Sequence, residues 1–145
     1  MCYMVYLSTD SAGDLTLRNS DRVRFEKPSA DIQAPPPPVL KHEHRWFVGS
    51  RSGCSCGFRH LPDQSVGLGF DQPEDWFPED REDIEATLRL YEILKDLVLR
   101  GHQVDLIDCW SGDDGREPVP LVVSLSEVPA ERYRLFEGHA FTLTA

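Results

Sequence analysis

The longest regular pattern in the chain is PEDREDIEATLRLYEILKDLVLR, at residues 78–100. Apolar residues recur in it at the three- and four-residue spacing of one helix face. Pro78 suits a first helical turn, where no N–H is needed, and the acidic residues after it lie where the helix dipole is positive. Gly101 is typical of the residue that ends a helix. The pattern predicts one long helix over residues 78–100, with an apolar face that must cover another layer.

Short apolar and β-branched runs on both sides of this segment predict strands. The clearest is residues 2–9, which is apolar enough to be buried on both faces. The predicted strands are residues 2–9, 44–50, 54–60, 104–110, 121–125 and 139–144, with a weaker alternation at 23–27. A short C-terminal helix is predicted over residues 129–137. Because strands and helices do not alternate regularly, we expect an α+β fold. It would be a single domain over residues 1–145, with a mixed or mainly antiparallel sheet covered by the long helix.

Composition excludes several functional classes. The chain has 145 residues and 25 acidic against 15 basic side chains, which give a net charge of −10. Such a balance argues against binding to a phosphate backbone or to an anionic membrane surface. No apolar run approaches the length of a membrane span, and the N-terminus lacks the basic region of a signal peptide. We therefore expect a cytoplasmic protein whose cysteines are reduced. Pro35–Pro38 predict a stiff, extended surface crossing.

The segment Gly53-Cys54-Ser55-Cys56-Gly57 carries the most chemistry. We predict that residues 44–50 and 54–60 form a hairpin, with Gly53 in the left-handed region at the end of a three-residue loop. The expected opposed pairs are Ser50 with Cys54, Val48 with Cys56, Trp46 with Phe58, and His44 with His60. Since alternate residues of a strand share a face, Cys54 and Cys56 would point to the same side of the sheet.

Two thiolates on one side of a strand can coordinate the same zinc ion, with Zn–S bonds of about 2.3 Å. Cys2 and Cys109, each near the end of a predicted strand, are the candidates for the two remaining ligands. His44 and His60 form a second candidate pair. A single C-x-C is not a recognised zinc signature. Our hypothesis is nevertheless a small, acidic, non-enzymatic protein with a structural metal site, zinc being the expected ion.

Two other functions compete with this hypothesis. In the first, Cys54 and Cys56 form a strained disulfide and serve as a thiol-redox pair. In the second, the cysteines are inert core residues, and Trp76 and Phe77 contact a basic protein partner together with the acidic residues of 71–85. The sequence contains no phosphate-binding loop, dinucleotide fingerprint or hydrolase motif. No reaction can therefore be named, and we do not expect an enzyme.

Overall fold

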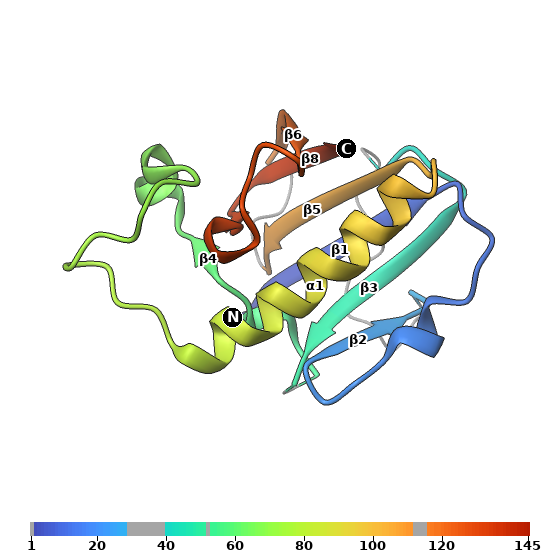
Figure 1. Cartoon of the computed structure of the whole chain (residues 1–145), viewed down its shortest axis with the longest axis horizontal. Helices are drawn as coiled ribbons and strands as arrows, with labels where there is room; N and C mark the ends of the chain where they lie inside the picture. The colour runs from blue at the N-terminus through green and yellow to red at the C-terminus, as the bar shows by residue number, and fades with distance from the viewer. Residues whose placement is uncertain (1, 29–39, 52, 112–115) are drawn as a thin grey trace.

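A six-stranded mixed sheet forms the centre of the molecule, and the helix α1 (Arg81–Leu99) lies across one of its faces (Figure 1). The computed structural model describes residues 2–28, 40–51, 53–111 and 116–145. The strand order is β2-β3-β1-β5-β8-β6. The strands are β1 (Tyr3–Thr9), β2 (Val23–Glu26), β3 (His44–Ser50), β5 (Val104–Trp110), β6 (Val119–Ser124) and β8 (His139–Thr144). The predicted α+β fold with one long helix is thus confirmed, while the predicted proline crossing at Pro35–Pro38 lies outside the described residues.

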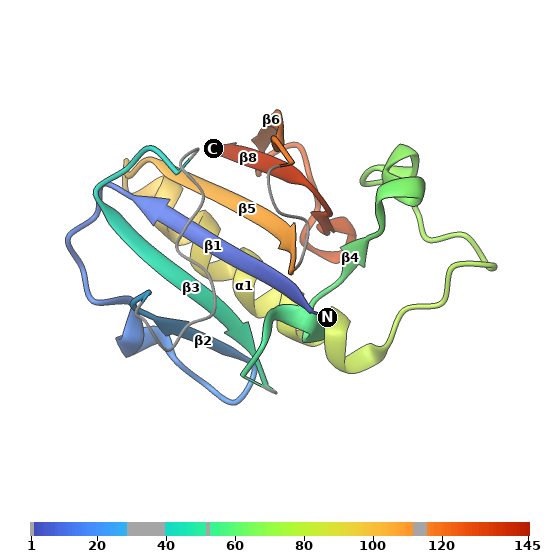
Figure 2. The same cartoon turned by 180° about the vertical axis from the view of Figure 1, so that it is seen from behind.

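Strand β1 occupies the middle of the sheet and pairs antiparallel with β3 on one side and β5 on the other. Leu7, for example, lies opposite Trp46 of β3 and Leu106 of β5. Only the pairing of the edge strand β6 with β8 is parallel among the described strands of this sheet. The sheet is therefore mixed, with β1 protected from solvent on both edges, as Figure 2 shows from the face opposite the helix.

Residues of β1 alternate between two hydrophobic clusters, because successive strand side chains point to opposite faces. Val5 and Leu7 pack into the main core beneath α1, whereas Met4 and Tyr6 belong to a smaller cluster on the other face. The helix contributes its apolar face to the main core through Ala86, Leu90, Tyr91, Ile93, Leu94 and Leu97. Burial of β1 on both faces agrees with its continuous apolar sequence.

Helix α1 ends close to the predicted position but begins three residues later. Asp80 is the residue before its first turn, so Pro78 lies outside the helix. At the other end Gly101 adopts a left-handed φ of 89°. The N–H of Gly101 donates to the Val98 carbonyl and that of His102 donates to the Leu97 carbonyl. This is a helix C-cap in which a left-handed glycine allows backbone N–H groups to bond to the last carbonyls of the helix. In the described parts of the chain, no helix is long and apolar enough to cross a membrane.

The predicted helix over residues 129–137 is wrong. This segment forms a single 3₁₀ turn, η4 (Ala130–Arg132), followed by the two-residue strand β7 (Leu135–Phe136). Tertiary contacts override the local pattern here, because Arg134 is buried and its guanidinium bonds to Glu79. Strand β7 pairs in parallel with β4 (His60–Leu61) in a second, two-stranded sheet.

The predicted hairpin of residues 44–50 and 54–60 is also wrong. Strand β3 is flanked by β1 and β2, and only at its end does the Ser50 N–H donate to the Cys54 carbonyl, at 2.7 Å, so residues 54–60 do not continue as a paired strand. That segment instead forms the 3₁₀ turn η2 (Ser55–Gly57) and then β4. The predicted left-handed conformation of Gly53 is confirmed, since its φ is 86°.

Candidate metal centre

The turn η2 is held across the ends of β1 and β3 by two serine side chains. The buried Ser55 hydroxyl donates to the Val48 carbonyl at 2.6 Å and accepts from the Val5 N–H at 2.9 Å. The Ser50 hydroxyl donates to the Cys54 carbonyl at 2.7 Å and accepts from the Gly57 N–H at 3.0 Å. The two hydroxyls thus bond to backbone N–H and carbonyl groups that would otherwise pair with a neighbouring strand. These bonds favour a turn over a strand at residues 55–57.

Three cysteines meet at this turn. The sulfur atoms of Cys2, Cys54 and Cys56 all lie within 4.8 Å of one another. Cys2 is fixed by the adjoining strand end, because its N–H donates to the Ser111 hydroxyl and its carbonyl accepts from the Ser111 N–H, both at 2.8 Å. Tetrahedral zinc with 2.3 Å bonds separates its sulfur ligands by about 3.8 Å, so this cluster could hold a metal ion after small side-chain rotations.

The fourth cysteine lies elsewhere. Cys109 is opposite Met4 in the β1–β5 ladder and packs against the smaller cluster, on the sheet face away from α1. It does not join the group formed by the other three sulfur atoms. The predicted four-cysteine arrangement is therefore reduced to three, because the alternation of β5 directs Cys109 to the other side of the sheet.

The predicted pairing of His44 with His60 is wrong. His44 lies opposite Thr9 at one end of β1, whereas His60 stacks on Tyr3 at the other end. Tyr3 and Thr9 are six residue steps apart along the strand, a span of roughly 20 Å. The two histidines cannot share a metal ion.

His60 instead forms a buried dyad that the sequence analysis missed. Its Nδ1 lies 2.7 Å from a carboxylate oxygen of Asp108 in β5, and its Nε2 lies 2.7 Å from the Ser55 carbonyl. A carbonyl can only accept a hydrogen bond, so Nε2 carries a proton. Burial lowers the pKa of His60, but the charge of Asp108 and the hydrogen bonds to Asp108 and Ser55 outweigh it and raise that pKa above its usual value. The signal in the sequence was the presence of two carboxylates, Asp105 and Asp108, within the otherwise apolar run of β5.

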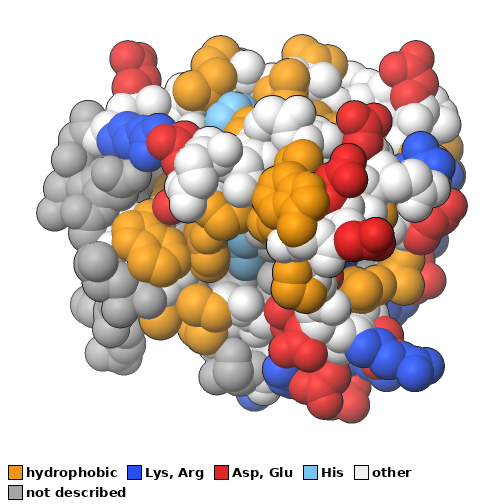
Figure 3. All heavy atoms as spheres, turned by 90° about the vertical axis from the view of Figure 1, so that its left-hand side faces the viewer, with side chains coloured by type: hydrophobic (Ala, Val, Ile, Leu, Met, Phe, Trp, Pro, Cys, Tyr) orange, Lys and Arg blue, Asp and Glu red, His pale blue; other side chains and the backbone are white. Residues whose placement is uncertain are grey.

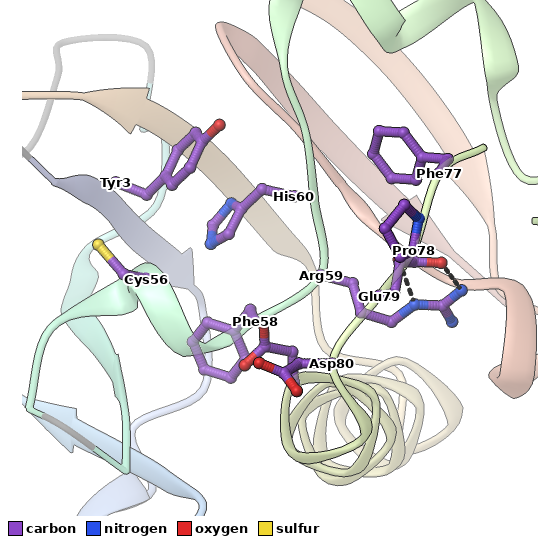
Figure 4. Close-up of a pocket in the computed structure, with 10 residues that line it drawn as sticks. Tyr3, Cys56, Phe58, Arg59, His60, Phe77, Pro78, Glu79 and Asp80 are labelled. Carbon is purple, nitrogen blue, oxygen red and sulfur yellow. Dashed lines mark hydrogen bonds and ion pairs between the residues drawn. The ribbon is translucent and has the colours of Figure 1, made fainter.

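Figure 4 shows His60 beside Tyr3, with the sulfur of Cys56 directed toward Tyr3. Although part of Cys56 is exposed, desolvation of its sulfur raises the pKa of the thiol to about 12. The Tyr3 N–H donates to this sulfur and offsets some of that rise. Metal binding would replace the thiol proton and place three soft donors around one ion, a set suited to zinc and to other thiophilic metals.

The two aromatic residues proposed as partner contacts occupy different environments. Trp76 is 66% exposed, and its ring meets Phe77 edge-on at 6.0 Å. Phe77 is half-buried and packs against the main core. Only Trp76 is thus presented to solvent as a large aromatic surface.

Comparisons of the chain with protein-family models, with curated proteins and with solved structures found no match, so the geometry of the cysteine cluster carries the functional argument alone.

Proposed function

We propose that this protein binds one metal ion through Cys2, Cys54 and Cys56, with zinc as the expected ion. The observation that carries the proposal is the mutual approach of the three sulfur atoms to within 4.8 Å. A three-sulfur site on zinc leaves one position for water or another small donor. Cys56 is exposed, so such a donor can reach the ion from solvent.

The proposed role of the ion is structural. Cys2 precedes the central strand β1, while Cys54 and Cys56 flank Ser55 in η2, so a shared ion would crosslink segments about fifty residues apart in sequence. The proposal includes a cytoplasmic location, because thiolate ligands persist in a reducing compartment.

A thiol-redox function uses the same proximity. It requires a thiol whose pKa is lowered, so that a thiolate is present at neutral pH. Desolvation acts in the opposite direction on Cys56. A metal ion also needs thiolate ligands, but its own charge replaces the thiol proton, and it uses all three sulfur atoms where thiol exchange uses two. The arrangement therefore supports metal binding better than it supports thiol exchange.

The test is a zinc titration of purified, untagged protein under reducing conditions, with bound metal counted by native mass spectrometry before and after a chelator. We expect one zinc ion for the unsubstituted chain. Cys56→Ser should weaken zinc binding by at least about a hundredfold, since a ligand is lost. Cys109→Ser is the matched control and should bind zinc as the unsubstituted chain does.

Circular dichroism of each variant separates loss of metal from loss of fold, and Cys54→Ser provides a second ligand variant should Cys56→Ser unfold. Bound zinc below about 0.2 equivalents in the unsubstituted chain would refute the proposal. Equal weakening by Cys56→Ser and Cys109→Ser would do the same.

A further inference from the structure

A pocket of about 310 Å³ opens between the cysteine turn and the start of α1. Aromatic rings form part of its wall, because Phe58, Phe77 and the stacked pair of Tyr3 and His60 line it, and charged side chains form most of the rest (Figure 4). This volume is at the lower end of the range for ligand pockets, so it fits a small group or a single side chain. The faces of Tyr3, Phe58 and Phe77 carry negative quadrupole charge and attract cations.

The carboxylates in this pocket differ in their pairing. Glu79 is neutralised, because it bonds to both Arg59 and Arg134. Asp80 and Asp83, at the start of α1, also line the pocket. Their side chains form no ion pair or hydrogen bond with any residue that the structure describes.

The two unpaired carboxylates lie close enough to affect each other. Burial raises the pKa of the Asp83 carboxyl, and the neighbouring charge of Asp80 raises it further. Arg51 and His60 act on the pKa of Asp83 in the opposite direction, but Arg51 forms its ion pair with Glu82 and His60 is paired with Asp108. A cation bound between Asp80 and Asp83 would relieve their repulsion.

The acidic and aromatic surface continues beyond the pocket. Trp76 is 66% exposed, and the neighbouring Glu74 and Asp75 are exposed as well. Figure 3 shows hydrophobic side chains bordered by carboxylates on this end of the molecule. The whole chain carries a net charge of −10, so its field favours a positively charged partner.

We infer that this end of the molecule docks an arginine- or lysine-rich segment of a partner protein, with one cationic side chain in the pocket beside Asp80 and Asp83. A guanidinium or ammonium group finds there both aromatic faces and two carboxylates. Trp76 and the acids next to it contact the flanking part of the segment. That extension beyond the pocket favours a peptide over an isolated small cation. The inference does not rest on the metal site.

Acidic residues at a helix start also stabilise the helix, so the test must separate binding from folding. Asp80→Asn with Asp83→Asn removes both charges, while asparagine remains a good residue before a helix. The control is Glu43→Gln with Glu127→Gln, which removes the same charge from exposed positions. Glu43 precedes β3 and Glu127 follows β6, both at the end of the sheet opposite Tyr3.

The probe is an oligo-arginine peptide, titrated into the purified full chain by calorimetry at low and at physiological salt. We expect the Asp80/Asp83 double variant to bind it at least about tenfold more weakly, and the control variant within about twofold of the unsubstituted chain. Trp76→Ala should weaken binding by about tenfold. N-acetyl-arginine amide, a single cation, should bind far more weakly than the peptide.

Three results would overturn the inference. The first is no binding of the peptide at low salt, and the second is equal weakening by the two double variants, which would show a general charge effect. The third is N-acetyl-arginine amide binding as tightly as the peptide, which would make the pocket a small-cation site.

Discussion

The aromatic rings of Tyr3 and His60 are stacked, with centroids 3.9 Å apart and planes inclined by 4°. Tyr3 follows Cys2 in the chain, and the Nε2 of His60 faces the carbonyl of Ser55, the residue between Cys54 and Cys56. Asp108 holds the other nitrogen of the same ring. The stack and the two hydrogen bonds of the His60 ring therefore link both cysteine-bearing segments to β5.

We expect His60→Phe to weaken zinc binding about tenfold or more, because a partner that orients ligands is lost while an aromatic ring remains against Tyr3. His44→Phe is the matched control, since His44 lies at the far end of β1. Competition with a chromogenic chelator measures both affinities. Equal affinities in the two variants would contradict a positioning role for His60.

The dyad also predicts how stability depends on pH. The pKa of His60 is raised in the folded protein above its usual value near 6.5. Between the usual pKa of histidine and the raised pKa of His60 in the folded protein, the folded state then binds more protons than the unfolded state. The stabilisation that His60 contributes to the free energy of unfolding should consequently be complete below about pH 6.5 and be lost as the pH rises through the raised pKa of His60. Urea unfolding at a series of pH values measures how the free energy of unfolding changes with pH. This change should be smaller in His60→Phe. An equal change in both proteins would contradict the predicted contribution of His60.

Gly57 is the position in the cysteine turn that tolerates no side chain. A Cβ at Gly57 would lie 2.5 Å from the Ser50 hydroxyl oxygen and 2.8 Å from the Ser50 Cβ. Gly57→Ala should lower the free energy of unfolding by about 1–3 kcal/mol, because the turn must shift. Gly67→Ala, which meets nothing within 4 Å, should change it by less than about 0.5 kcal/mol. Denaturant unfolding of both variants measures the difference, and similar losses would show that the turn has room.

The buried carboxylate of Glu79 should matter far more to stability than an exposed one. Glu79 is held by Arg59 and Arg134, whose side chains are at most 2% exposed. Glu79→Gln should lower the free energy of unfolding by about 3 kcal/mol, since it leaves two buried guanidinium groups without their counter-charge. Glu92→Gln, in an exposed pair with Arg89, should cost less than about 0.5 kcal/mol. Thermal and urea unfolding provide the comparison, and a small effect at Glu79 would mean that water screens the cluster.

The sequence by itself determined the elements whose cause is local. The apolar spacing over residues 78–100 and the glycine after it specify a helix, and the structure has that helix at Arg81–Leu99. The continuous apolar run at residues 2–9 specifies a strand buried on both faces, which is β1. The left-handed conformation of Gly53 follows from turn chemistry alone. In each case the pattern that predicts the element lies within one short segment, although the strands that pair with β1 come from far along the chain.

Only the tertiary structure decided which segments meet. Residues 54–60 resemble a strand, but β1 and β2 already occupy both edges of β3, so the segment turns at η2 and brings Cys54 and Cys56 to Cys2. Residues 129–137 resemble a helix, but burial of Arg134 against Glu79 draws them into an extended path. Cys109 has the same side chain as the other three cysteines, yet its place in β5 sends it to the opposite face. Local patterns encode the periodicity of one segment, whereas competition for a strand edge or for a buried charge involves residues far apart in the chain.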